Sequence, residues 1–206
     1  RGPRGAMIMC KKTDRLAKTE GLDVSSSGSE TETPEARLLR EKQAAKAKDL
    51  AAKIDSAVFP GLQGGPHEHV IAGKAVAFKE AMTDEFKIYA HQIVKNAKTL
   101  AQTLMDNEIK LTTNGTDNHL MVMDLRSFGP SLGKPAAIAL EEAGIVANFN
   151  TVPYDPSPPF KPSGIRMGTP ILTTRGMKES EMKVVGESIA KVIKNINNTE
   201  LKQKIK

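Results

Sequence analysis

Two short motifs carry the residue types best suited to binding anions. Gly64 and Gly65 lie in the first of them, FPGLQGGPH, at residues 59–67. Because glycine lacks a side chain, consecutive glycines can adopt positive φ and direct their backbone N–H groups toward one anion, such as a phosphate. The prolines of the motif favour a fixed loop, and a run typical of a helix follows from His69. A plain turn before a helix is the simpler alternative, because the spacing matches neither the Walker nor the dinucleotide-binding glycine pattern.

The second motif, PSGIRMGTP at residues 162–170, places Arg166 between two glycines. Gly164 and Gly168 add little bulk beside the guanidinium, whose rigid set of donors can bind a carboxylate in a bidentate manner. Taken alone, such an arginine is more simply explained as one half of a surface ion pair. Together, the two motifs are suited to binding a phosphate and a carboxylate.

Several longer stretches, all in the expected order, resemble the serine hydroxymethyltransferase family of fold-type I pyridoxal-phosphate enzymes. They are RGPRG at 1–5, DSAVFPGLQGGPHEH at 55–69, IAGKAVAFKEA at 71–81, GTDNHLMVMDL at 115–125, NTVPYDPSPPF at 150–160 and SGIRMGTPILTTRG at 163–176. The resemblance covers nearly the whole chain except residues 12–53 or so. It implies an α/β fold in which the end of a large cofactor-binding domain is followed by a small C-terminal α/β sandwich domain.

The resemblance also implies roles for five residues. Arg166 matches the arginine that binds the carboxylate of serine or glycine. Gly64 and Gly65 match a loop that reaches the cofactor phosphate of the other subunit in a homodimer, and Arg4 matches an arginine that supports the cofactor pocket. Asn150 matches the asparagine that hydrogen-bonds the pteridine ring of tetrahydrofolate. The implied cofactor is pyridoxal 5′-phosphate, with tetrahydrofolate as cosubstrate.

In this family the lysine that forms the Schiff base lies just upstream of the motif that begins here at Arg1. We therefore expect no catalytic residue in this chain itself. We predict that it is a subunit fragment of a transferase of one-carbon metabolism and amino-acid biosynthesis, inactive alone, whose complete form interconverts serine and glycine. Two alternatives stay open: a non-catalytic fragment, pseudoenzyme or assembly module, and a folate-independent threonine-type aldolase.

Two positions depart from the family pattern. Tyr154 stands where many bacterial members have Asn, and Asn114 replaces a Gly that usually opens the TDNHL segment. We expect both changes to affect loop conformation near Asn150, and neither to affect Arg166.

Composition limits the remaining classes of protein. No run reaches the roughly 18 apolar residues of a membrane span, so we expect no membrane partner. The net charge of +6 permits attraction to polyanions, but basic and acidic residues are mixed and aromatic residues make up only 4%, so we expect no nucleic-acid partner. The single Cys10 cannot form an internal disulfide, which fits a cytoplasmic location, and its apolar run at residues 6–10 predicts a buried strand.

A metal site is the other function to consider, because His67, Glu68 and His69 are adjacent potential ligands. Adjacent ligands on a loop rarely suffice, and no third and fourth ligand follow at a recognisable spacing. We therefore predict no metal site.

The resemblance implies two domains, because a long helix links the large and small domains in this fold type. We place the boundary at the start of the helix predicted from residue 84, so that residues 1–83 end the large domain and residues 84–206 form the small one. A charged insertion occupies about residues 12–53. Helices are predicted at 35–54, 69–82, 84–106, 134–143 and 178–196, and strands at 109–113, 119–125, 145–149 and 164–168. Asn114 and Gly115 predict a tight turn between the first two strands, and helices should cover one face of the sheet.

Overall fold

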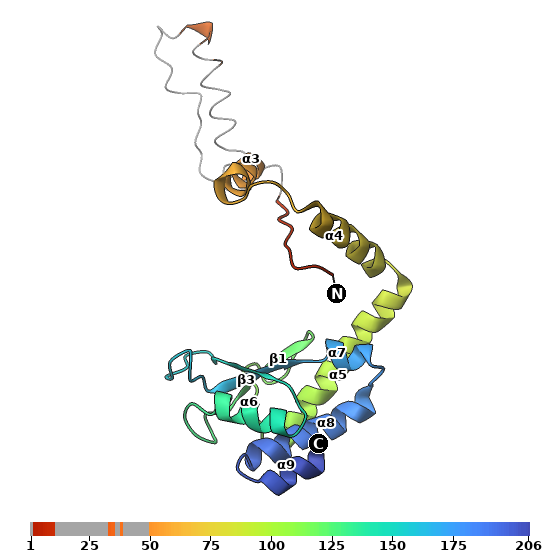
Figure 1. Cartoon of the computed structure of the whole chain (residues 1–206), viewed down its shortest axis with the longest axis vertical. Helices are drawn as coiled ribbons and strands as arrows, with labels where there is room; N and C mark the ends of the chain where they lie inside the picture. The colour runs from red at the N-terminus through yellow and green to blue at the C-terminus, as the bar shows by residue number, and fades with distance from the viewer. Residues whose placement is uncertain (1, 11–32, 36–37, 39–49) are drawn as a thin grey trace. The chain divides into compact units, whose positions relative to one another are not determined.

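The computed structural model describes residues 2–10, 33–35, 38 and 50–206. The chain divides into two compact units, Arg1–Glu80 and Ala81–Lys206 (Figure 1). The charged insertion and most of the helix predicted at residues 35–54 lie outside the described residues. None of the helices in the described part of the chain is long and apolar enough to cross a membrane.

The first unit contains α3 (Leu50–Ser56), the irregular turn η1 (Ala57–Leu62) and α4 (Glu68–Ala81). Helix α4 confirms the helix predicted at residues 69–82. Residues 2–6 run along α4, since Lys74 Nζ donates to the Ala6 carbonyl at 3.2 Å and a Cβ on Gly73 would lie 3.1 Å from the Pro3 ring. None of the residues of α3, η1 or α4 is buried.

The buried strand predicted at residues 6–10 is wrong for this structure. This segment forms no β-ladder and its apolar side chains are exposed, with Met9 83% exposed. Cys10, which the same prediction placed inside a strand, is exposed as well. An extended segment buries its apolar side chains when it joins a sheet that packs against another layer, and no described strand pairs with this segment.

The second unit contains a three-stranded antiparallel sheet in the order β1-β3-β2. Its strands are β1 (Leu120–Asp124), β2 (Asn148–Asn150) and β3 (Gly164–Gly168). Strands β1 and β3 confirm the predictions at residues 119–125 and 164–168.

Two other predicted strands are shorter than expected. The strand predicted at 109–113 is reduced to a single bridge between Leu111 and Met123, because the chain turns at Asn114 and Gly115, whose φ angles are 51° and 137°. The predicted turn is therefore present. The strand predicted at 145–149 begins only at Asn148, because the Ile145 amide is used to close the preceding helix by donating to the Leu140 carbonyl at 2.8 Å.

Five helices belong wholly to the second unit. They are α5 (Asp84–Asp106), α6 (Gly133–Glu142), α7 (Pro170–Thr174), α8 (Glu179–Lys194) and α9 (Thr199–Ile205). Helices α5, α6 and α8 confirm the helices predicted at 84–106, 134–143 and 178–196, whereas α7 and α9 were not predicted. The Thr83 hydroxyl caps α5 by accepting from the Phe86 amide at 3.2 Å, and Asn198 caps α9 in the same way.

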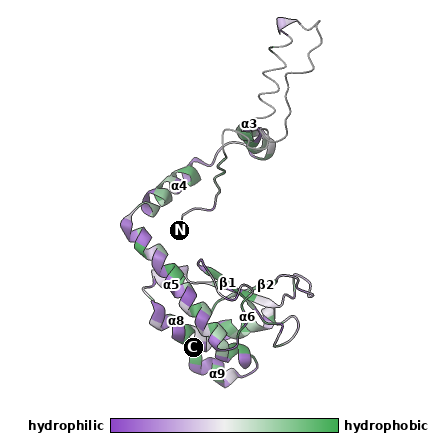
Figure 2. Cartoon of the chain, turned by 180° about the vertical axis from the view of Figure 1, so that it is seen from behind, coloured by the Kyte–Doolittle hydropathy of each residue, from purple (hydrophilic) through white to green (hydrophobic). Residues whose placement is uncertain are grey.

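Helices α5, α6 and α8 lie on one face of the sheet, as expected (Figure 1). Polar and apolar residues alternate along α5 and α8, so that each helix buries one side (Figure 2). The two helices cross closely at Gly186, where a Cβ would lie 2.8 Å from Thr103 Cγ2. The largest fully buried apolar side chains are Leu100, Leu104, Ile109, Leu111, Met123, Leu125, Leu140, Ile165, Met182, Ile189 and Val192.

Candidate ligand-binding face of the small sheet

The residues predicted to bind substrate and folate lie on the face of the sheet that turns away from the helices. Successive side chains of a strand point to opposite faces, and the core takes Met121, Met123 and Ile165. The strand register then places Val122, Arg166 and Asn148 in one row on the opposite face. Asn150 is paired with Gly164 in the next row of that face. The structure therefore brings Arg166 and Asn150 together.

The Arg166 side chain is exposed and available to a ligand. Within the described residues its guanidinium makes no hydrogen bond or ion pair, so the surface ion pair considered as an alternative is not formed there. Arg166 borders two open grooves of about 710 and 400 Å³. The larger groove is also lined by Asn150 and the loop at residues 112–118, and the smaller by His119 and Asn148.

The two glycines beside Arg166 have a further role that the sequence did not reveal. A Cβ on Gly164 would lie 2.6 Å from the Met123 carbonyl oxygen, and one on Gly168 would lie 2.7 Å from the His119 carbonyl oxygen. Both distances are far below van der Waals contact. Glycine is therefore needed at these positions for β3 to approach β1, besides keeping the surroundings of Arg166 open.

The glycine loop lies in the first unit, and its role in binding an anion stays a prediction. Neither Gly64 nor Gly65 has a positive φ, so the nest of N–H groups that such angles permit is not formed in this structure. No heavy atom would lie within 4 Å of a Cβ at either glycine, so the backbone here is open to approach. Arg4 is exposed in the same unit, on the segment that runs along α4. The predicted cofactor residues thus share one unit, and the predicted substrate and folate residues share the other.

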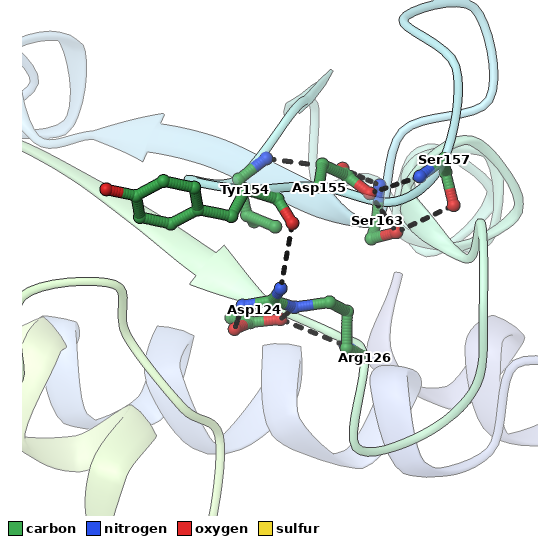
Figure 3. Close-up of polar contacts among 7 residues, drawn as sticks. Asp124, Arg126, Tyr154, Asp155, Ser157 and Ser163 are labelled. Carbon is green, nitrogen blue, oxygen red and sulfur yellow. Dashed lines mark hydrogen bonds and ion pairs between the residues drawn. The ribbon is translucent and has the colours of Figure 1, made fainter.

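A carboxylate at the centre of the loop between β2 and β3 was missed by sequence reasoning (Figure 3). Asp155 Oδ1 accepts from the Ser157 amide at 3.0 Å and the Ser163 hydroxyl at 2.8 Å. Its Oδ2 accepts from the Ser163 amide at 2.9 Å and the Val152 amide at 3.3 Å. Burial alone would raise the pKa of Asp155, but these donors outweigh it and lower the pKa to about 2. The Asp-x-Ser pattern at 155–157 is typical of such a turn and could have indicated it.

A second carboxylate, at the end of β1, binds an arginine that donates a hydrogen bond to the same loop (Figure 3). The buried Asp124 accepts from Arg126 Nη2 at 2.7 Å and from Nε at 2.9 Å, while Arg126 Nη1 donates to the Tyr154 carbonyl at 3.4 Å. The hydrogen bonds from Arg126 lower the pKa of the Asp124 carboxyl, against burial, which alone would raise it. The ion pair therefore stays charged and ties Tyr154 to the sheet.

Both departures from the family pattern fall where the backbone is left-handed. The φ angle is 54° at Tyr154 and 51° at Asn114. Asparagine adopts this conformation readily, whereas for a bulky residue it is strained. The substitution at Asn114 is therefore well tolerated, while Tyr154 holds a strained backbone with a side chain that is 98% exposed.

The histidines do not form part of a metal centre among the residues that the structure describes. His67 and His69 contact each other edge to face, with ring centroids 5.7 Å apart. No group of three or more His, Cys, Asp or Glu side chains within the described ranges could hold a metal ion.

Comparison with known proteins identifies the family. A family model described as serine hydroxymethyltransferase matches residues 35–189. A curated serine hydroxymethyltransferase from Methanospirillum hungatei is 55% identical over 159 residues, which are 77% of this chain and 38% of the relative.

Relatives of the same name from Koribacter versatilis and Campylobacter jejuni are each 52% identical and cover 79% and 77% of this chain. The chain spans about two fifths of the length of the curated relatives it matches. The resemblance inferred from the motifs is thereby confirmed, and the mixed α/β fold agrees with it. The chain belongs to the serine hydroxymethyltransferase family.

Proposed function

We propose that this chain supplies the substrate-carboxylate and folate-binding part of a pyridoxal-phosphate enzyme that interconverts serine and glycine, with tetrahydrofolate as the one-carbon acceptor. One observation carries the proposal: Arg166 lies exposed and without a partner among the described residues, on the same face of the sheet as Asn150. Membership of the family supports it.

Arg166 is suited to holding the amino acid by its carboxylate. The guanidinium offers two parallel N–H donors, which fix both the position and the orientation of a carboxylate. Fixing the carboxylate also fixes which bond at Cα is presented for cleavage, and such orientation lowers the entropic part of the barrier. Asn150, one row away on the sheet, presents an amide that can donate to and accept from a heterocyclic ring such as a pteridine.

Three of the described residues are suited to holding the cofactor, namely Gly64, Gly65 and Arg4. Pyridoxal phosphate, when bound, supplies the electron sink for the bond broken at Cα. Gly64 and Gly65 fit the cofactor phosphate, because the space around their backbone is open and their N–H groups can approach an anion closely. Arg4, exposed in the same unit, adds a positive charge that suits the cofactor pocket.

The proposal also includes the domain boundaries, the oligomeric state and the cellular compartment of the enzyme. Residues 1–83 belong to the large domain and residues 84–206 to the small one, and the division into units after Glu80 supports this boundary. The enzyme is a homodimer in which Gly64 and Gly65 approach the cofactor of the other subunit, and it works in the cytoplasm. Neither the family model nor the relatives favour a threonine-type aldolase or a non-catalytic module.

The test is to replace Arg166 in the complete enzyme that contains this chain. Arg166→Lys keeps the charge but loses the bidentate donor geometry, so we expect the KM for serine to rise about a hundredfold, the equivalent of ~3 kcal/mol. Arg175→Lys is the matched control, because Arg175 is also an exposed arginine of this unit but follows α7, outside the strands of the sheet.

Conversion of serine to glycine should also require tetrahydrofolate, whereas a threonine-type aldolase would work without it. Equal KM values for the two arginine variants would remove the role proposed for Arg166.

A further inference from the structure

The strand that carries Asn150 is weakly held by the sheet alone. Strand β2 has only three residues and lies at the edge of the sheet, paired with β3 alone. The pair Asn150 and Gly164 is its last pair, and the loop at residues 151–163 follows. Short edge strands hold their register poorly without further contacts, and closing a loop of this length costs conformational entropy.

The Asp155 carboxylate supplies contacts where the ladder stops (Figure 3). Its Oδ2 accepts from the amides of Val152 and Ser163 together, and these residues lie at the two ends of the loop. Val152 is two residues after Asn150, and Ser163 is three residues before Arg166. A single oxygen atom thus bridges the two chain segments that leave β2 and enter β3.

The far end of this bridge is fixed to the core of the unit. Ser163 is fully buried, and its carbonyl accepts from the Leu125 amide at 3.0 Å. The Ser163 hydroxyl donates to Asp155 Oδ1 at 2.8 Å, which fixes the carboxylate from a second direction. Asp155 therefore connects the start of the loop to a rigid part of the fold.

We propose that Asp155 is a positioning residue, which keeps β2 aligned with β3 and so sets Asn150 at the correct separation from Arg166. The inference rests on the function proposed above, in which these two residues bind folate and the amino acid. A carboxylate is required because both of its oxygens accept from N–H or O–H donors, whereas an asparagine at this position would direct an NH₂ group at some of those donors. Disturbing Asp155 therefore affects both ligands through one movement of the loop.

The test is Asp155→Asn in the complete enzyme. We expect the KM for serine and the Kd for tetrahydrofolate both to rise about tenfold, with kcat changed by less than about threefold, because misplacing a binding group weakens the binding it performs. The matched control is Asn96→Ala, because the buried Asn96 side chain on α5 makes three hydrogen bonds of 2.9 Å that the variant removes. Its Nδ2 donates to the Thr173 hydroxyl and the Met177 carbonyl, and its Oδ1 accepts from Gln92 Nε2. The control should lower Tm comparably and leave both binding constants unchanged.

A milder variant keeps the test decisive if Asp155→Asn does not fold. Ser163→Ala removes one donor to Asp155 and leaves the backbone bonds, so both constants should rise together by a smaller factor of about three. If the Asp155 or Ser163 variants lose Tm like the control but keep both constants within twofold of the wild type, Asp155 is only structural and the inference is overturned. If the wild-type enzyme itself shows no tetrahydrofolate-dependent conversion of serine, the proposed function fails instead.

Discussion

The two units of this chain differ in how they bury apolar side chains. The unit at residues 81–206 buries 21 apolar side chains around α5, α8 and the sheet. In the described residues up to 80, none is buried. Along α4, Ile71, Val76 and Phe78 remain 51%, 64% and 47% exposed. Both units contain well-formed helices, but a core is present in the second unit and not among the described residues of the first.

This difference matters for the proposed site because the glycine loop and the pair Arg166 and Asn150 belong to different units and are stabilised to different extents. Helix α4 has 14 residues, and isolated helices of that length are only marginally stable in water. The glycine loop that precedes it therefore depends on contacts beyond those that the described residues make. Arg166 and Asn150, in contrast, project from a sheet whose other face is packed against helices. We expect Arg166 and Asn150 to be positioned by this chain alone.

Hydrogen exchange should show the largest contrast between the units. Amides of α5 and α8 exchange only when the core opens, so we expect protection of about a thousandfold or more, whereas α4 should show little. The measurement is hydrogen–deuterium exchange of the chain at neutral pH, followed by mass spectrometry of peptides from each helix. Equal protection in α4 and α5 would show that the first unit has its own cooperative structure.

Matched truncations of one apolar side chain in each unit should give the next largest contrast. Leu104 is fully buried, so Leu104→Ala should lower the free energy of unfolding by about 2–5 kcal/mol. Ile71 is half exposed on α4, so Ile71→Ala should change it by less than about 0.5 kcal/mol. Urea denaturation of both variants measures the difference. A large loss at Ile71 would mean that α4 is packed more tightly than its exposure indicates.

The same contrast shows which parts of the fold could be predicted from sequence. Helix α5 begins and ends at the predicted residues, because its apolar residues repeat with helical spacing over many turns and Thr83 provides a cap. The five-residue α7 has no such repeat. It depends on tertiary contacts such as the Thr169 hydroxyl, which donates to the Ile93 carbonyl at 2.9 Å, and these contacts are invisible in the sequence.

For the candidate site, residue types were easier to predict than conformation. The motifs indicated Arg166 and Asn150, but the sequence could not show that they share a face, because that depends on the register of two strands. The positive φ that Gly64 and Gly65 could adopt is absent, since glycine permits such angles without requiring them. Asp155 was overlooked because its donors are mostly backbone amides, whose direction depends on how the loop folds.

Acid should destabilise the second unit through Asp155. The folded-state pKa of Asp155 is lowered to about 2, below its ordinary value of 3.8. Its charged form therefore stabilises the fold above pH 4 or so, and that contribution is lost as the pH falls from about 4 through about 2. Because the carboxylate is only partly buried and solvent screens its interactions, this contribution is on the order of 1 kcal/mol at neutral pH.

The measurement compares the free energy of unfolding of the wild type and Asp155→Asn between pH 6 and pH 2. The difference between the two proteins should shrink as the pH falls, and comparing them cancels the similar contribution of Asp124, whose pKa is also lowered. A difference that is constant with pH would mean that the Asp155 charge does not contribute.

Tyr154→Asn should give the smallest effect and the only gain in stability. The φ angle of 54° at this position is strained for tyrosine, and the ring is 98% exposed, so it contributes no packing to set against the strain. Asparagine tolerates the left-handed conformation, as Asn114 does at a φ of 51° in the same unit. We expect the free energy of unfolding to rise by about 0.5–1 kcal/mol in urea denaturation.

Tyr154→Ala is the control for this last change, because it removes the same ring but lacks the short side-chain amide that lets asparagine adopt the left-handed conformation readily, so its effect should stay within about 0.5 kcal/mol. If asparagine and alanine give the same result, the strain is not in the backbone of residue 154. If asparagine alone stabilises the protein, the second unit tolerates a strained residue in the loop after Asn150 because its core is sufficient to hold it. No residue of the first unit that the structure describes is buried to provide such a core.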